Sequence, residues 1–182
     1  MTESMGTTIP QAKRSFPESG DATISLRPIT DDDLEFLFRL YASTRIEEKK
    51  LVNWPDDQWQ QFLRMQFNLQ HNQYMVNYRN PSFDIIMENE VPTGRFYVNR
   101  NADDYRLIDI ALLPDFQRRG IAAALLKALI TEADSVGIPV SLHVEKNNPV
   151  LDYYQRLGFR ISEDKEVYYF MVRSPAANVY AA

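Results

Sequence analysis

The sequence predicts an α/β protein of the α+β type, built as one domain around a mixed sheet. Segments with the period of an amphipathic helix alternate with short apolar segments typical of strands, in the order β-α-α-β-β-β-α-β-α-β-β. One strand segment, YRLIDIALL at 105–113, is almost continuously apolar, as is typical of a central strand covered on both faces. A chain of 182 residues is long enough to bury a substantial core.

The domain is predicted to begin after a leader. Residues 1–22 are rich in Ser, Thr, Gly and Pro and show no periodicity, so we expect a flexible leader there. Apolar and polar residues alternate over 23–30, which predicts the first strand. Thr30 is the expected cap of a helix whose first turn carries three aspartates, favoured there by the helix dipole. The predicted domain covers 23–174, and 175–182 is an expected tail.

Two helices and two strands are predicted next. The first helix has a helically spaced apolar stripe, which consists of Leu34, Leu37, Phe38 and Tyr41. The second helix begins near Pro55 and carries a broad aromatic and aliphatic face, formed by Trp59, Phe62, Leu63 and Leu69. The segments FDIIMENE and GRFYVNR then predict two strands joined near Asn89–Gly94.

The second half of the chain alternates strands and helices. A helix is predicted from Gly120 to Val136, stopped by Gly137 and, two residues later, by a proline. The strand VSLHVE over 140–145 should place His143 on the opposite face from its apolar residues. A short helix, PVLDYYQRL, and a terminal hairpin, FRISEDKEV with YYFMVRS, complete the prediction.

The composition argues against several classes of function. The chain has no cysteine, so it can form neither a disulfide nor a thiolate zinc site, and His71 and His143 are far apart; we expect no metal. A net charge of −5 argues against broad nucleic-acid binding, which needs a basic face. No apolar run approaches the roughly 18 residues of a membrane span, and the N-terminus lacks a signal-peptide core. We therefore expect a cytoplasmic protein with neither a nucleic-acid nor a membrane partner.

The segment QRRGIA at 117–122 has the features of an anion-binding helix start. The first amides of a helix have no intrahelical acceptor, and the helix dipole is positive at that end. Gly120 lets a bound group approach the backbone, and Arg118 and Arg119 suit phosphate oxygens. The segment is neither a Walker P-loop nor the dinucleotide pattern G-x-G-x-x-G. The alternative left open is a plain helix start with two solvated arginines.

The segment NNPVLDYYQRLGF at 147–159 places two tyrosines in a short helix. A phenol beside a leaving thiolate can donate a proton, because their ordinary pKa values, about 10 and about 8.5, are close. Tyr153 or Tyr154 could act in this way. The alternative is that both tyrosines are packing residues.

Taken together, DIALLPDFQRRGIA and, about 25 residues later, NPVLDYYQRLGF resemble the GCN5-related N-acetyltransferase (GNAT) family. The element order resembles that family over about 23–174. The resemblance implies a mostly antiparallel sheet, splayed between its fourth and fifth strands, with helices on both faces. It also implies an enzyme that transfers the acetyl group of acetyl-CoA to a primary amine of a small molecule or a peptide, by direct attack in a ternary complex.

The resemblance also implies a set of cofactor-binding residues. The backbone of Ile110 and Leu112 should pair with the pantetheine arm, and Asn148 matches an asparagine that bonds this arm. Tyr154 matches the tyrosine that protonates the departing thiolate. Ala122 stands where the family more often has a second glycine. The pyrophosphate should lie on the N–H groups of the turn, formed by Gln117, Arg118, Arg119, Gly120, Ile121 and Ala122.

The general base is not identified by the resemblance. Many members carry a glutamate early in the fourth strand, near the position where Arg106 stands here. Asp109 and His143 are the two catalytic candidates, because either could accept a proton through water. The alternatives are an ion pair with a neighbouring arginine for Asp109 and a structural role for His143. Glu88 and Glu90 are weaker candidates.

The acceptor is expected near the first two helices, where YASTRIEEKKLVNW (41–54) combines mixed charge with aromatic residues; the alternative left open is a solvated loop. Two other functions stay open. One is a non-catalytic acyl-CoA sensor, which the missing glutamate keeps under consideration; the other is an interaction protein in which QRRG only caps a helix. A homodimer through exposed aromatic residues such as Trp54, Trp59 and Tyr180 is also left open.

Overall fold

The computed structural model describes residues 14–16, 23–78 and 81–176. Most of the expected leader (1–22), and the expected tail after Ala176, lie outside the described residues. Within the leader, Arg14–Phe16 forms strand β1 and pairs antiparallel with the next strand. The domain bounds stay a prediction.

Among the described residues, eight strands form one sheet in the order β1-β2-β3-β4-β5-β6-β8-β7. The strands after β1 are β2 (Ile24–Pro28), β3 (Pro81–Glu88), β4 (Val91–Arg100), β5 (Tyr105–Leu112), β6 (Val140–Glu145), β7 (Arg160–Asp164) and β8 (Tyr168–Arg173). Every neighbouring pair is antiparallel except β5 and β6, which are parallel. The predicted mixed, mostly antiparallel sheet is therefore confirmed.

The sheet splays apart between its two parallel strands, β5 and β6. Only three residues of each strand are in register, Tyr105–Leu107 of β5 with Val140–Leu142 of β6. A bulge in β5 lies at the end of this pairing, because Tyr97 pairs with Asp109 and Val98 with Leu107, which leaves Ile108 unmatched. The sequence did not predict β1, so the fourth and fifth predicted strands are β5 and β6.

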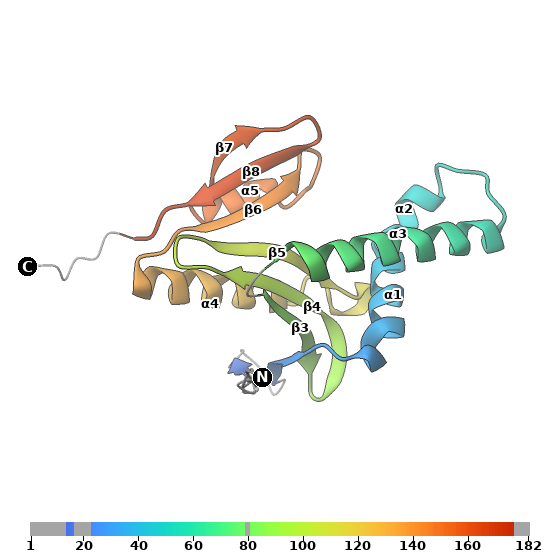
Figure 1. Cartoon of the computed structure of the whole chain (residues 1–182), viewed down its shortest axis with the longest axis horizontal. Coiled ribbons are helices and arrows are strands. Elements are labelled where there is room, and N and C mark those ends of the chain that lie inside the picture. Colours follow the sequence, from blue (N-terminus) through green and yellow to red (C-terminus); the bar gives the residue numbers. More distant parts are fainter. Residues whose placement is uncertain (1–13, 17–22, 79–80, 177–182) are drawn as a thin grey trace, which may run out of the picture.

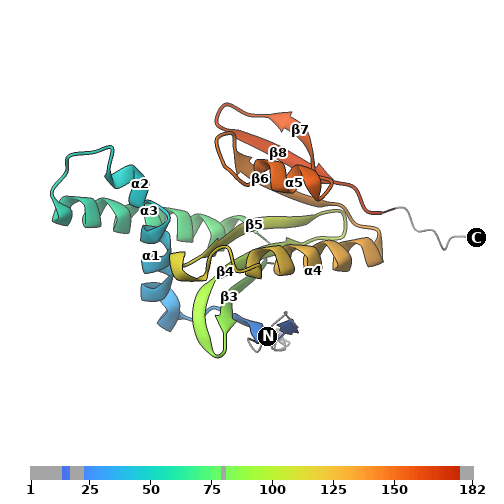
Figure 2. The same ribbon diagram turned by 180° about the vertical axis from the view of Figure 1, so that it is seen from behind.

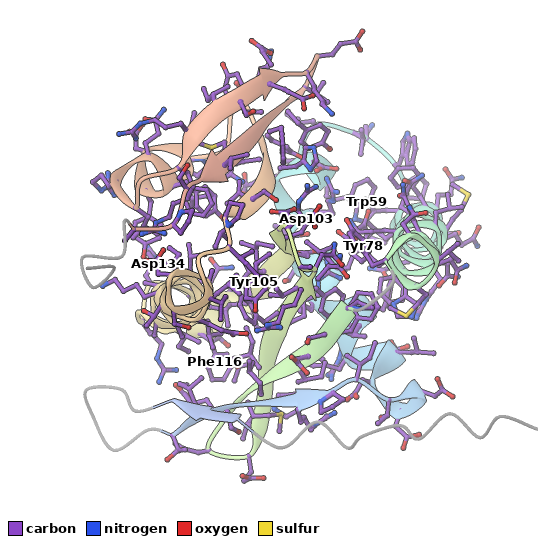
Figure 3. All side chains as sticks on the ribbon, turned by 60° about the vertical axis from the view of Figure 1, so that its left-hand side comes forward. Trp59, Tyr78, Asp103, Tyr105, Phe116 and Asp134 are labelled. Carbon is purple, nitrogen blue, oxygen red and sulfur yellow. The ribbon has the colours of Figure 1, made fainter. Side chains whose placement is uncertain are left out.

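Helices cover both faces of the sheet (Figures 1 and 2). On one face, α1 (Leu34–Ser43) and α3 (Asp56–Asn77) bury a cluster that includes Leu37, Leu63 and Tyr97. On the other, α4 (Ile121–Val136) and α5 (Leu151–Arg156) bury a cluster that includes Leu129, Leu142 and Phe159. Figure 3 shows α3 and α4 almost end-on, with the central strands between them. The short α2 (Ile46–Lys49) follows α1.

The start of α1 differs in detail from the prediction. The Thr30 backbone N–H donates to Asp33 Oδ2 at 2.8 Å, and Arg27 binds the same carboxylate, with 2.7 Å between its Nη2 and Oδ1. The three aspartates form a 3-10 turn (Asp31–Asp33) before α1 begins at Leu34. Leu34 is 39% exposed, so its place in the predicted stripe was wrong. This first residue of α1 lies at the rim of the packed face, which is formed by Phe36, Leu37, Phe38, Leu40 and Tyr41.

The aromatic face of α3 also needs correction. Trp59 is only 7% exposed and lies in the core between α1 and α3 (Figure 3), so it is not an exposed aromatic. Trp54, 44% exposed, packs edge-on against it. Leu69 is 60% exposed, because the buried face of the helix runs through Leu63 and Phe67 and position 69 is rotated away from it. Tyr180 lies outside the described residues, and the homodimer stays a prediction.

Gly94, expected as the first residue of its strand at the end of the joining segment, lies inside β4, because the hairpin turn is the shorter Asn89–Glu90. A Cβ at Gly94 would stand 2.3 Å from the carbonyl oxygen of Ala111. We therefore expect Gly94→Ala to lower the free energy of unfolding by about 3 kcal/mol in urea denaturation. Gly158→Ala is the control: there only the left-handed backbone is strained, since the nearest atom is 3.7 Å away, and about 1 kcal/mol is expected. Equal stability of the two variants would contradict this reading of the β4–β5 contact.

Within the part of the chain that the structure describes, no helix is long and apolar enough to cross a membrane. The cytoplasmic location stays a prediction.

Candidate active site

A cleft of about 740 Å³ lies where the sheet splays. Ile108–Ala111 of β5 line it, with His143–Glu145 of β6 on one side and the α1–α3 region on the other. Tyr78, just after α3, lies between that helix and the sheet (Figure 3). Four of the predicted site residues line this cleft, namely Asp109, Ile110, His143 and Asn148. The other predicted site residues are not among its lining residues.

The backbone of β5 supplies one edge of the cleft. From Ile108 onward β5 has no partner in β6, so one edge of this central strand lacks ladder hydrogen bonds. The side chain of Ile110 packs toward the α4 cluster. The carbonyl of Leu112 already accepts a hydrogen bond from Gln117 Nε2 at 2.9 Å. An extended polar ligand could therefore pair with this strand near Ile110.

The QRRGIA turn continues directly from this strand, through a 3-10 turn at Pro114–Phe116. Arg118 (φ 59) and Gly120 (φ 86) both have left-handed backbones, and they turn the chain into α4. The first intrahelical bond runs from Ala124 N–H to Gly120 O at 2.9 Å, so the amides of residues 121–123 have no acceptor within the helix. These amides lie at the positive end of a 16-residue helix, as an anion site requires.

The two arginines of the turn differ in their surroundings. Arg119 Nη2 lies 2.8 Å from Glu88 Oε1, and its guanidinium lies over the Phe116 ring at 5.3 Å. Arg119 therefore anchors the turn to β3. Arg118 is exposed and has no ion-pair partner among the described residues, so it is the arginine available to a ligand anion. Glu88, a weaker candidate for the base, is engaged by Arg119, and neither it nor Glu90 lines the cleft.

Tyr154 is a buried residue of α5. It is 9% exposed and packs against Phe159, with 5.8 Å between the ring centroids. Burial, with smaller contributions from the Asp109 carboxylate and Tyr153, raises its pKa to about 12. The phenol is therefore protonated at neutral pH. Its pKa lies farther above the thiol value of about 8.5 than the ordinary tyrosine value does.

Asp109 is held in an ion pair. Its Oδ2 accepts from Arg95 Nη2 at 2.6 Å and from the Tyr74 hydroxyl at 3.0 Å. Arg95 is 5% exposed and also donates to Gln70 Oε1 at 3.1 Å. Burial lowers the pKa of Arg95, but the Asp109 carboxylate offsets this, so that the pKa stands above its ordinary value. Burial and the same carboxylate raise the pKa of Tyr74, which stays a neutral donor.

His143 lies on the exposed side of β6, with its ring 5.0 Å from that of Phe170. Partial burial, followed by the charges of Arg106 and Lys165, lowers the pKa of His143 below its ordinary value. The imidazole is therefore neutral at pH 7 and can accept a proton. Arg106, which stands near the family's glutamate position, donates to Ser141 Oγ at 2.5 Å and pairs with Asp104.

The helical wall of the cleft was anticipated only in part. Arg45 and Glu48 line it, paired at 2.5 Å between Nη1 and Oε1. Glu47 and Lys50 instead pair with each other outside it. The sequence did not predict the cleft residues of the second half of α3 and the residue after it, namely Gln70, Gln73, Tyr74, Asn77 and Tyr78. Their spacing by three and four residues was a detectable signal of one shared helical face.

Arg95 was also missed. A charged residue in a strand normally faces solvent, and no local feature of GRFYVNR distinguishes a buried arginine. Among the residues that the structure describes, no group of three His, Asp or Glu side chains is placed to hold a metal ion.

Comparisons with known proteins find similarity in sequence and in fold. The profile of the acetyltransferase (GNAT) family matches residues 40–159. The [ribosomal protein bS18]-alanine N-acetyltransferase of Salmonella typhimurium is 39% identical over 70 residues, which are 37% of this chain and 47% of that protein. The chain thus matches just under half the length of this curated relative.

Solved structures share the fold. The PaiA N-acetyltransferase from Thermoplasma acidophilum, solved in complex with coenzyme A, has a TM-score of 0.60 at 18% identity; the match covers 83% of this chain and 98% of that one. Arabidopsis thaliana Naa50, solved with the bisubstrate analogue CoA-Ac-MVNAL, has a TM-score of 0.55 at 15% identity, with coverages of 83% and 98%.

Proposed function

The chain belongs to the acetyltransferase (GNAT) family, and from this premise we propose that it is an N-acetyltransferase that transfers the acetyl group of acetyl-CoA to a primary amine. One observation carries the proposal: the unpaired edge of β5 leads directly into a helix start with free amides. The first can pair with an extended amide-containing arm, and the second can bind its phosphates.

The residues present fit acetyl-CoA. The β5 backbone near Ile110 and the side chain of Asn148 are placed in the cleft, where they would hold the pantetheine arm. The amides after Gly120 and the side chain of Arg118 would hold the pyrophosphate. Ala122, in place of a glycine, adds only one methyl group to this first turn. When bound, acetyl-CoA supplies an acyl group activated as a thioester.

In the proposed reaction, His143 takes a proton from the acceptor ammonium, directly or through water, because an amine with a pKa near 10 is otherwise protonated. The amine nitrogen then bonds to the acyl carbon, and the carbon–sulfur bond breaks. Backbone N–H groups of β5 stabilise the charge on the carbonyl oxygen. Tyr154 would donate its proton to the sulfur as the carbon–sulfur bond breaks. The second proton of the amine nitrogen, which is released when the amide forms, would pass through water to Tyr154 and restore its hydroxyl.

The acceptor is proposed to be a polar amine, either a peptide or a small molecule. The cleft wall opposite β6 carries amide and hydroxyl side chains, among them Gln73, Asn77 and Tyr78. Such groups suit an acceptor that has hydrogen-bonding groups beside its amine. The partial similarity to an enzyme named for a ribosomal-protein alanine supports a peptide acceptor.

His143→Gln is expected to lower kcat/KM at pH 7 by about tenfold. Since the pKa of His143 is lowered, wild-type activity should fall only as the pH drops through that lowered value, where the imidazole becomes protonated. The variant should lose this acid limb of the pH–rate profile. His71→Gln is the matched control, because His71 also has a lowered pKa but stacks on Phe67 and does not line the cleft. An unchanged acid limb in His143→Gln would remove His143 from the base role.

The function itself is tested by two measurements on the wild-type chain. Calorimetric titration with coenzyme A should show saturable binding, and release of free thiol from acetyl-CoA should require an added peptide or small-molecule amine. Binding without thiol release across the amine panel would favour the acyl-CoA sensor. No binding, together with capture of a stable protein partner, would favour the interaction protein.

A further inference from the structure

Four side chains that line the cleft form a cluster, which we call the β5 lock: the buried Arg95 of β4 and the half-buried Gln70 and Tyr74 of α3 and Asp109 of β5. Arg95 Nη2 donates to Asp109 and Gln70, and Tyr74 donates to the same oxygen of Asp109. The Arg95 and Asp109 side chains are only 6% and 17% exposed. Arg95 Nε is buried and has no hydrogen-bond partner among the described residues. Asp109 is therefore the main group that stabilises this buried cation.

The β5 lock holds the part of β5 that has lost its neighbour. Asp109 follows the bulged residue Ile108 directly, at the point where β6 stops pairing. The bulge turns both side chains toward α3: Ile108 packs on the α1–α3 cluster, and Asp109 binds Tyr74. Ile110, the next residue, packs on the opposite face. This part of β5 has no β6 strand beside it, so the contacts of its own side chains hold its backbone in place.

The charges argue against Asp109 as a base. Asp109 Oδ2 already accepts hydrogen bonds from Arg95 Nη2 and from the Tyr74 hydroxyl. Asp109 is also the counter-charge of a guanidinium whose side chain is only 6% exposed. No other carboxylate forms an ion pair with Arg95 among the described residues.

We propose that Asp109 is a positioning residue and not the general base: with Arg95, Gln70 and Tyr74 it holds the bulged backbone of β5 where acetyl-CoA must bind. This inference rests on the proposed function. It couples the helical wall of the acceptor side to the strand that binds the cofactor, because α3 contributes two of the four members. Substitutions that weaken the β5 lock should raise KM for acetyl-CoA and should not change the apparent pKa values of the pH–rate profile.

The main test is a charge-removal cycle. Asp109→Asn keeps the size of the side chain but leaves Arg95 uncompensated, and kcat/KM for acetyl-CoA should fall about thirtyfold. Arg95→Met with Asp109→Asn removes both charges and should recover to within about fivefold of wild type, because no buried charge is then unpaired. Both variants should retain the acid limb of the wild-type profile. A double variant as inactive as Asp109→Asn, or loss of the acid limb, would overturn the proposal.

Tyr74→Phe is a second variant that keeps both charges and should fold. It removes one charge-assisted hydrogen bond, so KM for acetyl-CoA should rise about tenfold while kcat changes less. Glu35→Gln is the matched control, since it also removes a contact between α3 and another element, the 3.0 Å ion pair of Arg64 with Glu35 of α1, but on the exposed surface. An unchanged KM in Tyr74→Phe would contradict the β5 lock. Wild-type protein that binds no coenzyme A would instead refute the proposed function, so the two failures are distinguishable.

Discussion

Replacing Tyr154 with Phe is expected to lower kcat by about a hundredfold and to change the affinity for coenzyme A by less than about threefold. The substitution removes one hydroxyl and leaves the ring, which packs against Phe159 in the core. Folding and cofactor binding should therefore persist, while the leaving sulfur loses its donor. Because burial raises the pKa of this phenol to about 12, the wild-type donor keeps its proton throughout the neutral and mildly alkaline range.

The neighbouring Tyr153→Phe is the matched control for Tyr154→Phe. The Tyr153 hydroxyl is buried and has no hydrogen-bond partner among the described residues, so its removal should cost neither stability nor activity. Single-turnover measurements at saturating acetyl-CoA would compare the chemical step in the two variants. If Tyr154→Phe keeps the wild-type rate, or if both variants lose equally, Tyr154 is not the donor to sulfur.

Gly120→Val is expected to weaken coenzyme A binding by about a hundredfold, equivalent to about 2.7 kcal/mol. Gly120 has a φ of 86, a region that β-branched residues avoid, so the turn must shift to admit valine. A shifted turn would misdirect the free amides that follow Gly120, and the added side chain would occupy space beside the phosphate. Calorimetric titration with coenzyme A measures the effect directly.

Gly137→Val supplies the control for that variant. Gly137 ends the same helix with a φ of 70, and a Cβ there would meet nothing within 4 Å. Both substitutions impose a left-handed backbone on valine and should cost similar stability. Only Gly120→Val should reduce affinity. Equal affinities in the two variants would mean that this turn does not hold the pyrophosphate.

Much of the fold was predictable from local patterns. The helix after Gly120 and the strand at 140–145 follow from periodicity, glycine and proline over a few neighbouring residues. The free amides of the QRRGIA turn follow from the position of a helix start alone. The same reasoning failed at Leu34 and Leu69, because the extent of a buried face depends on which neighbouring helix covers it.

The candidate site could be predicted only in part. The cleft contains Asp109, Ile110, His143 and Asn148, all named from motifs or strand position. The part of its helical wall that α3 supplies was missed, because the spacing of Gln70, Tyr74 and Tyr78 shows a shared face but not what that face covers. A polar helical face is usually solvated, and only packing against β5 makes this one part of a cleft.

The sequence by itself determined the order of the elements apart from β1 and the short α2, the helix start with free amides after Gly120, and the tyrosine-bearing helix. Each of these features depends on residues that are close to one another in the sequence. Only the tertiary structure decided that Asp109 is the counter-ion of Arg95 and not a free carboxylate, and that Arg119 anchors the turn to Glu88. The partner of a charge is set by the approach of strands and helices that are distant in the chain, and a residue's chemical role depends on that partner and on how completely water is excluded from the pair.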